Sequence, residues 1–193
     1  PFLTGSEIGN IIKAYNEGQL AGDGNFAKEC YYLIENKIKT KKALLTHSCT
    51  AALEITSHLM NLNPGDEVIM PSYTFVSTAN AFALRGCIPV FVDIREDTLN
   101  IDESLIDQAV TDKTKALVVV HYAGVSCEMD KILKIAKDHN LFVIEAAAQG
   151  IISSYKGKPL GSMGEFGCLS FHETKNIHCG EGGALLVNNE NFT

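Results

Sequence analysis

The stretch Asn63-Pro64-Gly65-Asp66-Glu67-Val68-Ile69-Met70 joins a tight turn to an apolar run that is typical of a buried β-strand. Pro64 and Gly65 suit the turn, because proline fixes its own φ angle and glycine adopts a positive φ without strain. Similar β-forming runs follow along the chain, at residues 88–93, 116–121, 141–145, 167–171 and 184–187. The sequence therefore predicts six strands, of which residues 67–70 form the first.

Apolar residues also recur at helical spacing. Two amphipathic helices are predicted from positions three or four residues apart, at Phe26, Cys30, Leu33 and Ile34 and again at Met129, Ile132, Leu133 and Ala136. Helical segments separate the earlier strands, which favours strands that run in the same direction. The expected fold class is α/β, with a mainly parallel sheet flanked by helices.

Size and charge limit the class of function. The chain has 193 residues, of which 46% are hydrophobic, enough for one sizeable core and one domain. Its formal net charge is -7 at pH 7 and no basic run is present, which argues against a nucleic-acid surface. No apolar stretch approaches the roughly 20 residues that cross a bilayer, and residues 1–4 do not resemble a secretion signal. We therefore expect a cytoplasmic protein that acts on small molecules.

The six cysteines are scattered without a CxxC pair, at Cys30, Cys49, Cys87, Cys127, Cys168 and Cys179. This distribution favours reduced, mostly buried thiols over a disulfide framework or a zinc site. His172, His178 and Cys179 lie close together in the sequence, but a fourth ligand at the usual spacing is absent. We therefore expect no metal site there.

Ligands of open α/β sheets bind beyond the carboxyl ends of the strands, so polar residues that follow apolar runs are the candidates for chemistry. In the stretch 44–53, small and hydroxyl residues open a helix whose first N–H groups form a phosphate site, with a hydroxyl from Ser48 or Thr50. An ordinary N-cap explains the same pattern. In the stretch 71–80, Phe75 is placed to cover a flat ring, and a position in the core is the alternative.

Two later strand ends carry ionisable residues. One strand ends at Glu145 and the chain then reaches Gln149, where the acid is either functional or solvated at the edge of the sheet. Lys175 lies among aromatic and hydroxyl residues between two strands, and a desolvated neutral amine in such a place is nucleophilic. Taken alone, Lys175 is more often a surface lysine. The occurrence of all four segments in this order favours one common site.

In these segments the chain resembles the DegT/StrS family of nucleotide-sugar aminotransferases, over essentially its whole length. The resemblance is carried by residues 65–75, residues 89–94, and the Lys175 segment with residues 180–183. It implies that residues 1–193 form the large domain of the aspartate-aminotransferase fold, with a seven-stranded sheet that binds pyridoxal 5'-phosphate (PLP). The smaller C-terminal domain is absent, so we expect a part of a longer enzyme. The family also implies a homodimer whose active sites share residues across the interface.

The resemblance implies a role for each candidate residue. Lys175 forms a covalent bond with PLP and moves a proton during the reaction. Phe75 stacks on the pyridine ring, and Gln149 forms a hydrogen bond with the phenolic oxygen. The phosphate is held by backbone amides and hydroxyl groups at Cys49, Thr50 and Ser170.

One position departs from the family pattern. The family reads Glu-Asp-Ala-Ala-Gln where this chain has Glu145-Ala146-Ala147-Ala148-Gln149, so Ala146 stands where an aspartate is expected. That aspartate pairs with the ring nitrogen and keeps it protonated, so that the cofactor accepts electron density. Glu145 is a poor replacement without a bulge, because neighbouring residues of a strand point to opposite faces. The resemblance therefore implies weaker PLP binding and slower transamination than an aspartate would give.

The implied reaction moves an amino group from a donor such as L-glutamate to the 4-keto carbon of a dTDP-linked 6-deoxyhexose. Residues 119–125 and 170–176 look closest to family members with that substrate, and Lys175 separates the chain from related sugar dehydratases, which have histidine there. The alternative is a non-catalytic or truncated homologue that keeps the fold and binds phosphate or a sugar nucleotide. A generic nucleotide-binding domain is disfavoured, because a GxGxxG fingerprint is absent.

Overall fold

Seven strands form one sheet in the computed structural model, which describes residues 2–19 and 21–192. Across the sheet they follow the order β1 (Lys42–Thr46), β9 (Gly183–Val187), β8 (Phe166–Ser170), β5 (Phe142–Ala146), β4 (Thr114–Val120), β2 (Glu67–Pro71) and β3 (Ile88–Val92). β9 runs antiparallel to its neighbours β1 and β8, and every other neighbouring pair is parallel. The predicted mainly parallel α/β fold is therefore confirmed, and all strands except β9 end at the same edge of the sheet.

All six predicted strands are present, and their bounds agree within two residues. The prediction misses the strand β1 and a short hairpin formed by β6 (Ser154–Tyr155) and β7 (Lys158–Pro159). β1 lies at the edge of the sheet, where only Ala43 of its five residues is buried and Leu44 and Leu45 are exposed. The strand therefore lacks the pattern of burial that marks the strands inside the sheet.

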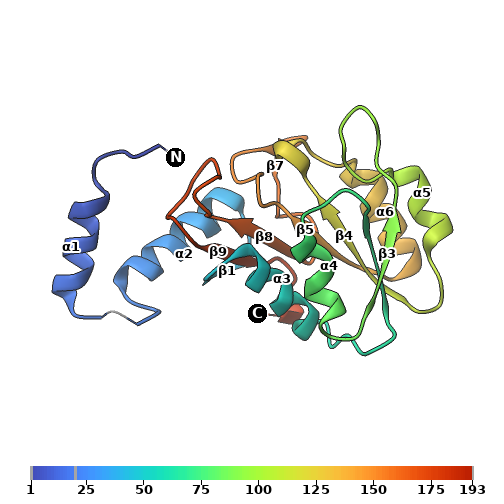
Figure 1. Ribbon diagram of the computed structural model, residues 1–193, viewed down its shortest axis with the longest axis horizontal. Helices are drawn as coiled ribbons and strands as arrows, with labels where there is room; N and C mark the ends of the chain where they lie inside the picture. The colour runs from blue at the N-terminus through green and yellow to red at the C-terminus, as the bar shows by residue number, and fades with distance from the viewer. Residues whose placement is uncertain (1, 20, 193) are drawn as a thin grey trace.

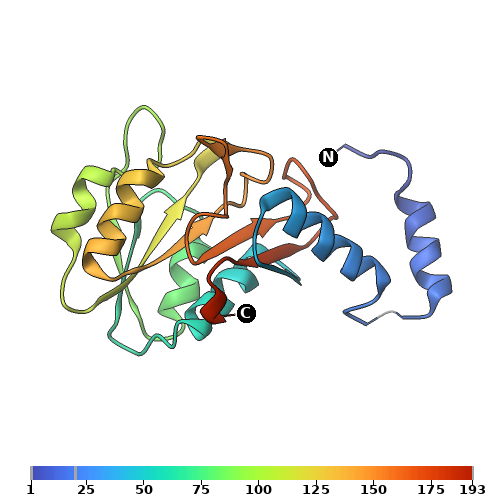
Figure 2. The same ribbon diagram turned by 180° about the vertical axis from the view of Figure 1, so that it is seen from behind.

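Helices cover both faces of the sheet (Figure 1), and Figure 2 shows the second face. One face carries α3 (Cys49–Leu59) and α4 (Val76–Ala83), and the other carries α2 (Asn25–Ile38), α5 (Glu103–Ala109) and α6 (Met129–His139). α1 (Glu7–Glu17) stands off from the sheet and buries none of its residues. Two 3-10 turns, η1 (Tyr122–Gly124) and η2 (Glu190–Phe192), follow β4 and β9. The described part of the chain contains no helix long and apolar enough to span a membrane.

Alternating side chains of the strands build two separate cores. In β2, Val68 and Met70 belong to the core that includes Phe82 of α4, whereas Ile69 belongs to the core that includes Ile132 of α6. All five side chains are fully buried. Successive strand residues point to opposite faces, and helices on both faces require apolar residues on both. The sheet is thereby held on two sides, which fixes the position of its carboxyl edge.

The two predicted helices are present, with one difference in burial. α6 buries Met129, Ile132 and Ala136, as its spacing predicts. In α2, by contrast, Cys30 and Leu33 of the predicted apolar face are exposed. α2 packs against the edge strand β1, and its first turns extend beyond the sheet (Figure 2). The amphipathic pattern therefore predicts the helix correctly, but it does not predict burial along the whole helix.

The prediction of mostly buried thiols is only partly correct. Cys87, Cys127 and Cys168 are buried, and Cys49 is half-buried. Two further cysteines, at positions 30 and 179, are exposed because α2 and the loop before β9 lie at the surface. All six are free thiols.

Candidate active site

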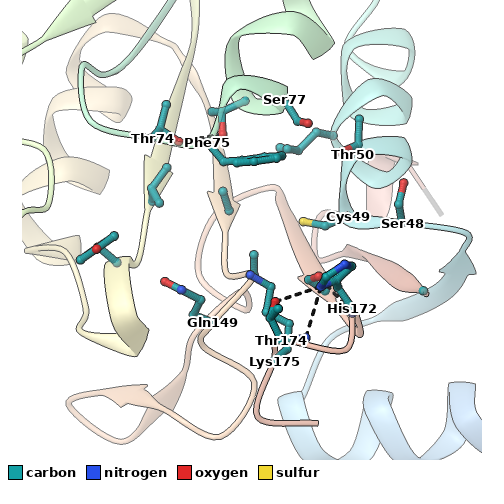
Figure 3. Close-up of a pocket in the computed structure, with 18 of the residues that line it drawn as sticks. Ser48, Cys49, Thr50, Thr74, Phe75, Ser77, Gln149, His172, Thr174 and Lys175 are labelled. Atoms are coloured by element: carbon teal, nitrogen blue, oxygen red, sulfur yellow. Dashed lines mark hydrogen bonds between the residues drawn. The ribbon is translucent and has the colours of Figure 1, made fainter. Parts of the chain in front are cut away.

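A cavity of about 620 Å³ lies at the carboxyl edge of the sheet (Figure 3). Its walls come from the segments that follow β1, β2, β4, β5 and β8 and from the residues that precede β9. This is the edge at which open α/β sheets bind their ligands. Every site residue predicted from the sequence lines this one cavity, namely Cys49, Thr50, Phe75, Ala146, Gln149, Ser170 and Lys175.

The start of α3 offers two free hydrogen-bond donors to the cavity. Ser48 is the N-cap, and its Oγ accepts a hydrogen bond from the amide of Ala51 at 3.1 Å, while its carbonyl oxygen accepts one from Ala52 at 3.2 Å. The amides of Cys49 and Thr50 have no acceptor among the residues that the structure describes. The N-cap interpretation is therefore confirmed, and it is compatible with a phosphate site, because capping leaves two N–H groups at the positive end of the helix.

Gly183 allows β9 to approach this helix start. A Cβ atom at this position would lie 2.6 Å from the backbone nitrogen of Cys49, which is closer than real side chains come. Gly183 is paired with Ser170 in the sheet, so the approach also brings the end of β8 next to the first turn of α3. The buried hydroxyl of Ser170 is thereby placed on the wall that carries the free amides.

Lys175 is half-buried and lines the cavity, on the opposite side from Phe75 (Figure 3). Its backbone amide donates to the carbonyl oxygen of His172 at 2.9 Å, in the turn that follows β8. Burial raises the pKa of the Cys49 thiol to about 12, while the positive charge of Lys175 acts in the opposite direction. Lys175 and Cys49 thus line the same cavity, and the charge of the lysine acts on the thiol at the start of α3.

Phe75 is the N-cap residue of α4 and is 75% exposed, although it lines the cavity. Its alternative interpretation as a core residue is wrong. A large apolar ring that stays exposed beside a cavity is available to a ligand. The predicted role of Phe75 as a cover for a flat ring stays a prediction.

The side chain of Gln149 is held in one orientation. Its Oε1 accepts a hydrogen bond from the backbone amide of Ala123 at 2.7 Å. A carboxamide has one acceptor atom and one donor group, so this contact leaves the NH₂ group for the cavity. A donor at this point is what an anionic oxygen of a ligand requires.

Glu145 and Ala146 point to opposite faces of the sheet, as the alternation of a strand predicts. Ala146 lines the cavity and is in the same core as Ile144 and Cys168. Glu145 is completely buried on the other face, where it accepts hydrogen bonds from His121 and from three backbone amides. The interpretation of Glu145 as a solvated acid at the edge of the sheet is therefore wrong, and its carboxylate does not line the cavity.

Among the cavity-lining residues that the structure describes, Glu181 is the only acid, and its Oε1 is 3.4 Å from Nε2 of His172. Nδ1 of His172 is 2.9 Å from the hydroxyl of Thr174. The wall at Ala146 thus offers a methyl group where the family pattern has a carboxylate.

The cavity also contains an aromatic pair that was not predicted from the sequence. Tyr73 follows β2 and Tyr122 follows β4; their ring centroids are 5.1 Å apart and their hydroxyl oxygens 3.2 Å apart. The hydrogen bond with Tyr73 raises the pKa of Tyr122. Both residues come directly after apolar strands, so the rule that selected Phe75 could have selected them too.

The two histidines and the cysteine that lie close together in the sequence at residues 172–179 have separate partners in the structure. His172 contacts Thr174, His178 Nε2 lies 3.0 Å from the carbonyl oxygen of Phe2, and the Cys179 thiol donates to the carbonyl oxygen of Glu181 at 3.2 Å. Within residues 2–19 and 21–192, no three His, Cys, Asp or Glu side chains are grouped so that they could hold a metal ion.

The doubly covered sheet, with a lysine, an aromatic ring and a free helix start lining a cavity at its carboxyl edge, has the aspartate-aminotransferase fold of solved aminotransferases. The chain belongs to the DegT/DnrJ/EryC1/StrS aminotransferase family, whose sequence profile matches residues 2–193.

Two curated relatives illustrate the extent of the match. Spore coat polysaccharide biosynthesis protein SpsC of Bacillus subtilis is 47% identical over 190 residues, which are 98% of this chain and 49% of that protein. GDP-perosamine synthase of Caulobacter vibrioides is 36% identical over 192 residues, which are 100% of this chain and 52% of that protein. The chain thus spans about half the length of the curated relatives that it matches.

Solved structures agree with the fold and with the cofactor of the family. DesI, determined in the presence of its TDP-sugar product, superimposes with a TM-score of 0.92 at 32% identity, over 100% of this chain and 48% of that one. NtdA of Bacillus subtilis, determined with the bound cofactor PMP, has a TM-score of 0.88 at 34% identity, over 98% of this chain and 44% of that one. PLP, of which PMP is the amino form, is the cofactor of the family.

Proposed function

We propose that residues 1–193 form the PLP-binding large domain of a cytoplasmic, homodimeric enzyme that transfers an amino group to a nucleotide-linked keto sugar. The observation that carries the proposal is that the half-buried Lys175 lines the same cavity as the free amides of Cys49 and Thr50. PLP requires two groups in its binding site. One is an amine that forms a covalent bond with its aldehyde, and the other is an anion site at a fixed distance from that amine.

Most of the cavity fits PLP. The amides at the start of α3, with the hydroxyls of Thr50 and Ser170, form a site for the phosphate. Phe75 is available to one face of the ring, and the NH₂ group of Gln149 is available to the phenolic oxygen. The bound cofactor supplies an electron sink for the carbon that loses its proton. Lys175 holds the aldehyde between turnovers and moves the proton at the reacting carbon.

One wall of the cavity does not match the family pattern. The side chain of Ala146 is a methyl group, and Glu145 is buried on the other face with four hydrogen-bond donors. A methyl group cannot keep the ring nitrogen protonated, so the electron sink is weaker. We propose that this chain binds PLP less tightly and transaminates more slowly than its Ala146→Asp variant.

The proposed substrate is a dTDP-4-keto-6-deoxyhexose, with an amino acid such as L-glutamate as donor. Residues 119–125 and 170–176 resemble the dTDP-4-amino-4,6-dideoxygalactose transaminases of enterobacterial common antigen synthesis. The TDP-sugar product of DesI supports the thymidine nucleotide, whereas the name of GDP-perosamine synthase points to a guanosine nucleotide. Calorimetric titration with dTDP and with GDP, in parallel, distinguishes the two: tighter binding of GDP would contradict the proposed nucleotide.

The covalent bond to Lys175 gives the most direct test of the proposal. The protein mixed with PLP is expected to turn yellow, to lose the colour on treatment with borohydride, and to carry one reduced pyridoxyl phosphate group on the peptide that contains Lys175. Lys175→Ala is expected to remove the label. Lys137→Ala is the matched control, because Lys137 is an exposed lysine of α6 outside the cavity. Labelling that persists in Lys175→Ala would contradict the assignment.

A non-catalytic homologue is the second candidate, and the methyl group of Ala146 favours it. Such a protein would keep the anion site of α3 and bind a sugar nucleotide without a covalent cofactor. It would stay colourless with PLP and still bind the nucleotide in a calorimetric titration. Yellow protein that reacts with L-glutamate would rule it out.

A further inference from the structure

A buried pair of ionisable residues lies directly beneath the cavity and has no place in the chemistry above. Nε2 of His121 is 2.9 Å from Oε2 of Glu145, and both side chains are completely buried. Oε2 also accepts a hydrogen bond from the amide of Gly161 at 2.8 Å. Oε1 accepts from the amides of Met163 at 2.5 Å and Gly164 at 2.7 Å. Four donors satisfy the carboxylate, as a buried charge requires.

The contacts of His121 decide its tautomer. Nδ1 accepts a hydrogen bond from the backbone amide of Cys127 at 3.2 Å, so Nδ1 carries no proton. The proton therefore resides on Nε2, which donates it to Glu145. The imidazole ring thus connects Cys127, at the end of the loop 121–127, to Glu145 of β5. Only the tautomer with its proton on Nε2 forms both hydrogen bonds.

The loop 121–127 is held at further points. The side chain of Asn100 accepts from the amide of Tyr122 at 2.9 Å and donates to the carbonyl oxygen of Val125 at 3.0 Å. Within the loop, Gly124 has a φ of 79°, and a Cβ atom there would lie 2.9 Å from the carbonyl oxygen of Gln149. The backbone of the loop therefore packs directly against the residue that follows β5.

This loop supplies the contact that orients the carboxamide of Gln149. The amide of Ala123, in the middle of the loop, donates to Oε1 of Gln149 at 2.7 Å. If the loop shifts, this N–H group shifts with it, and the carboxamide loses the contact that distinguishes its oxygen from its nitrogen. The buried ring of His121 is thus connected to the cavity through a single backbone amide.

We propose that His121 and Glu145 are positioning residues, which hold the loop 121–127 so that Ala123 fixes the Gln149 carboxamide with its NH₂ group toward the cavity. The contacts among these residues do not depend on any ligand. Their importance for a cofactor rests on the proposed function, in which Gln149 donates to the phenolic oxygen of PLP.

The first test uses the protein without PLP. His121→Leu removes both side-chain bonds of the ring at similar volume, and His121→Gln keeps a donor for Glu145. In His121→Leu we expect hydrogen exchange of the Ala123 amide to become about tenfold faster, the size expected for the loss of about one hydrogen bond. The side-chain NH₂ resonances of Gln149 are expected to move at the same time. His121→Gln is expected to restore most of both effects.

Ile106→Ala is the matched control for general loss of stability, because Ile106 is a fully buried residue of α5 outside the cavity. It is expected to lower the denaturation midpoint and to leave the Gln149 resonances in place. Unchanged exchange of Ala123 in His121→Leu, or the same changes in Ile106→Ala, would overturn the proposal. Should His121→Leu fail to fold, His121→Asn serves instead, because its polar side chain is too short to bridge Glu145 and the amide of Cys127 as the ring does.

A second test uses the protein mixed with PLP. Gln149→Leu and His121→Leu are each expected to shift the visible absorbance band of the bound cofactor in the same direction, and the double variant is expected to shift it no further. Fully additive shifts would overturn the connection between His121 and Gln149. Absence of any bound PLP in the parent protein would instead contradict the proposed function, and the exchange results on the ligand-free protein would remain valid.

Discussion

Replacing Ala146 by aspartate restores a carboxylate to the wall of the cavity. Ala146 is 5% exposed, lines the cavity, and lies in a core with Ile144 and Cys168. Without a cofactor, the new carboxylate lies at a position that is almost fully buried and is therefore largely desolvated. We therefore expect Ala146→Asp to lower the free energy of unfolding of the ligand-free protein by about 1–3 kcal/mol. With PLP bound, the carboxylate gains the ring N–H as its partner, and this loss should be recovered.

The magnitude of the catalytic gain follows from the electrostatic role of that carboxylate. Loss of one preorganised hydrogen-bonding group at a developing charge typically reduces kcat by about 100- to 1,000-fold. We expect Ala146→Asp to accelerate the reaction of the PLP-loaded protein with L-glutamate by a factor in this range. A single-turnover experiment that follows the loss of the visible band of PLP measures the rate. The rise in Tm on adding PLP should also be larger for the variant than for the parent protein.

Ala148→Asp is the matched control, because Ala148 also lines the cavity, two residues beyond Ala146. A carboxylate at this second position adds the same charge to the cavity at a different point of its wall. Equal single-turnover rates for the parent protein and Ala146→Asp would refute the reasoning. An equal acceleration by the two aspartate variants would refute the positional part of it.

Three further predictions concern single residues. Gly183→Ala is expected to lower the free energy of unfolding by about 2 kcal/mol and to weaken PLP binding, measured by denaturant titration and absorbance, because the new methyl group overlaps the start of α3; unchanged stability would contradict the close approach. With a pKa of about 12, Cys49 should be alkylated far more slowly at pH 8 than the exposed Cys30 and Cys179, and its rate should rise about tenfold per pH unit, which peptide mass mapping follows. Glu145→Leu is expected to lower the free energy of unfolding by about 3–5 kcal/mol, because it leaves four buried donors unpaired; a loss below about 1 kcal/mol would show that the donors find other partners.

The positions of the strands were accessible from the sequence, because strand signals are local. Apolar runs and turn residues located six of the seven strands of the sheet, and the rule that ligands bind at carboxyl ends selected residues that line one cavity, with Glu145 as the exception. Strand alternation also predicted that Glu145 would point away from the site of Ala146. The roles of the cavity residues came from the family resemblance, since a pattern of residue types does not specify a cofactor.

Contacts between distant segments required the tertiary structure. The sequence determined which residues end a strand and which face of the sheet each side chain takes, because both depend on neighbours along the chain. Only the folded chain decided that Glu145 meets His121 and three amides of a later turn, that Gly183 touches the start of α3, and that Ala123 orients Gln149. These contacts depend on which strands are neighbours in the sheet, and strand order is set by packing over the whole domain rather than by any local pattern.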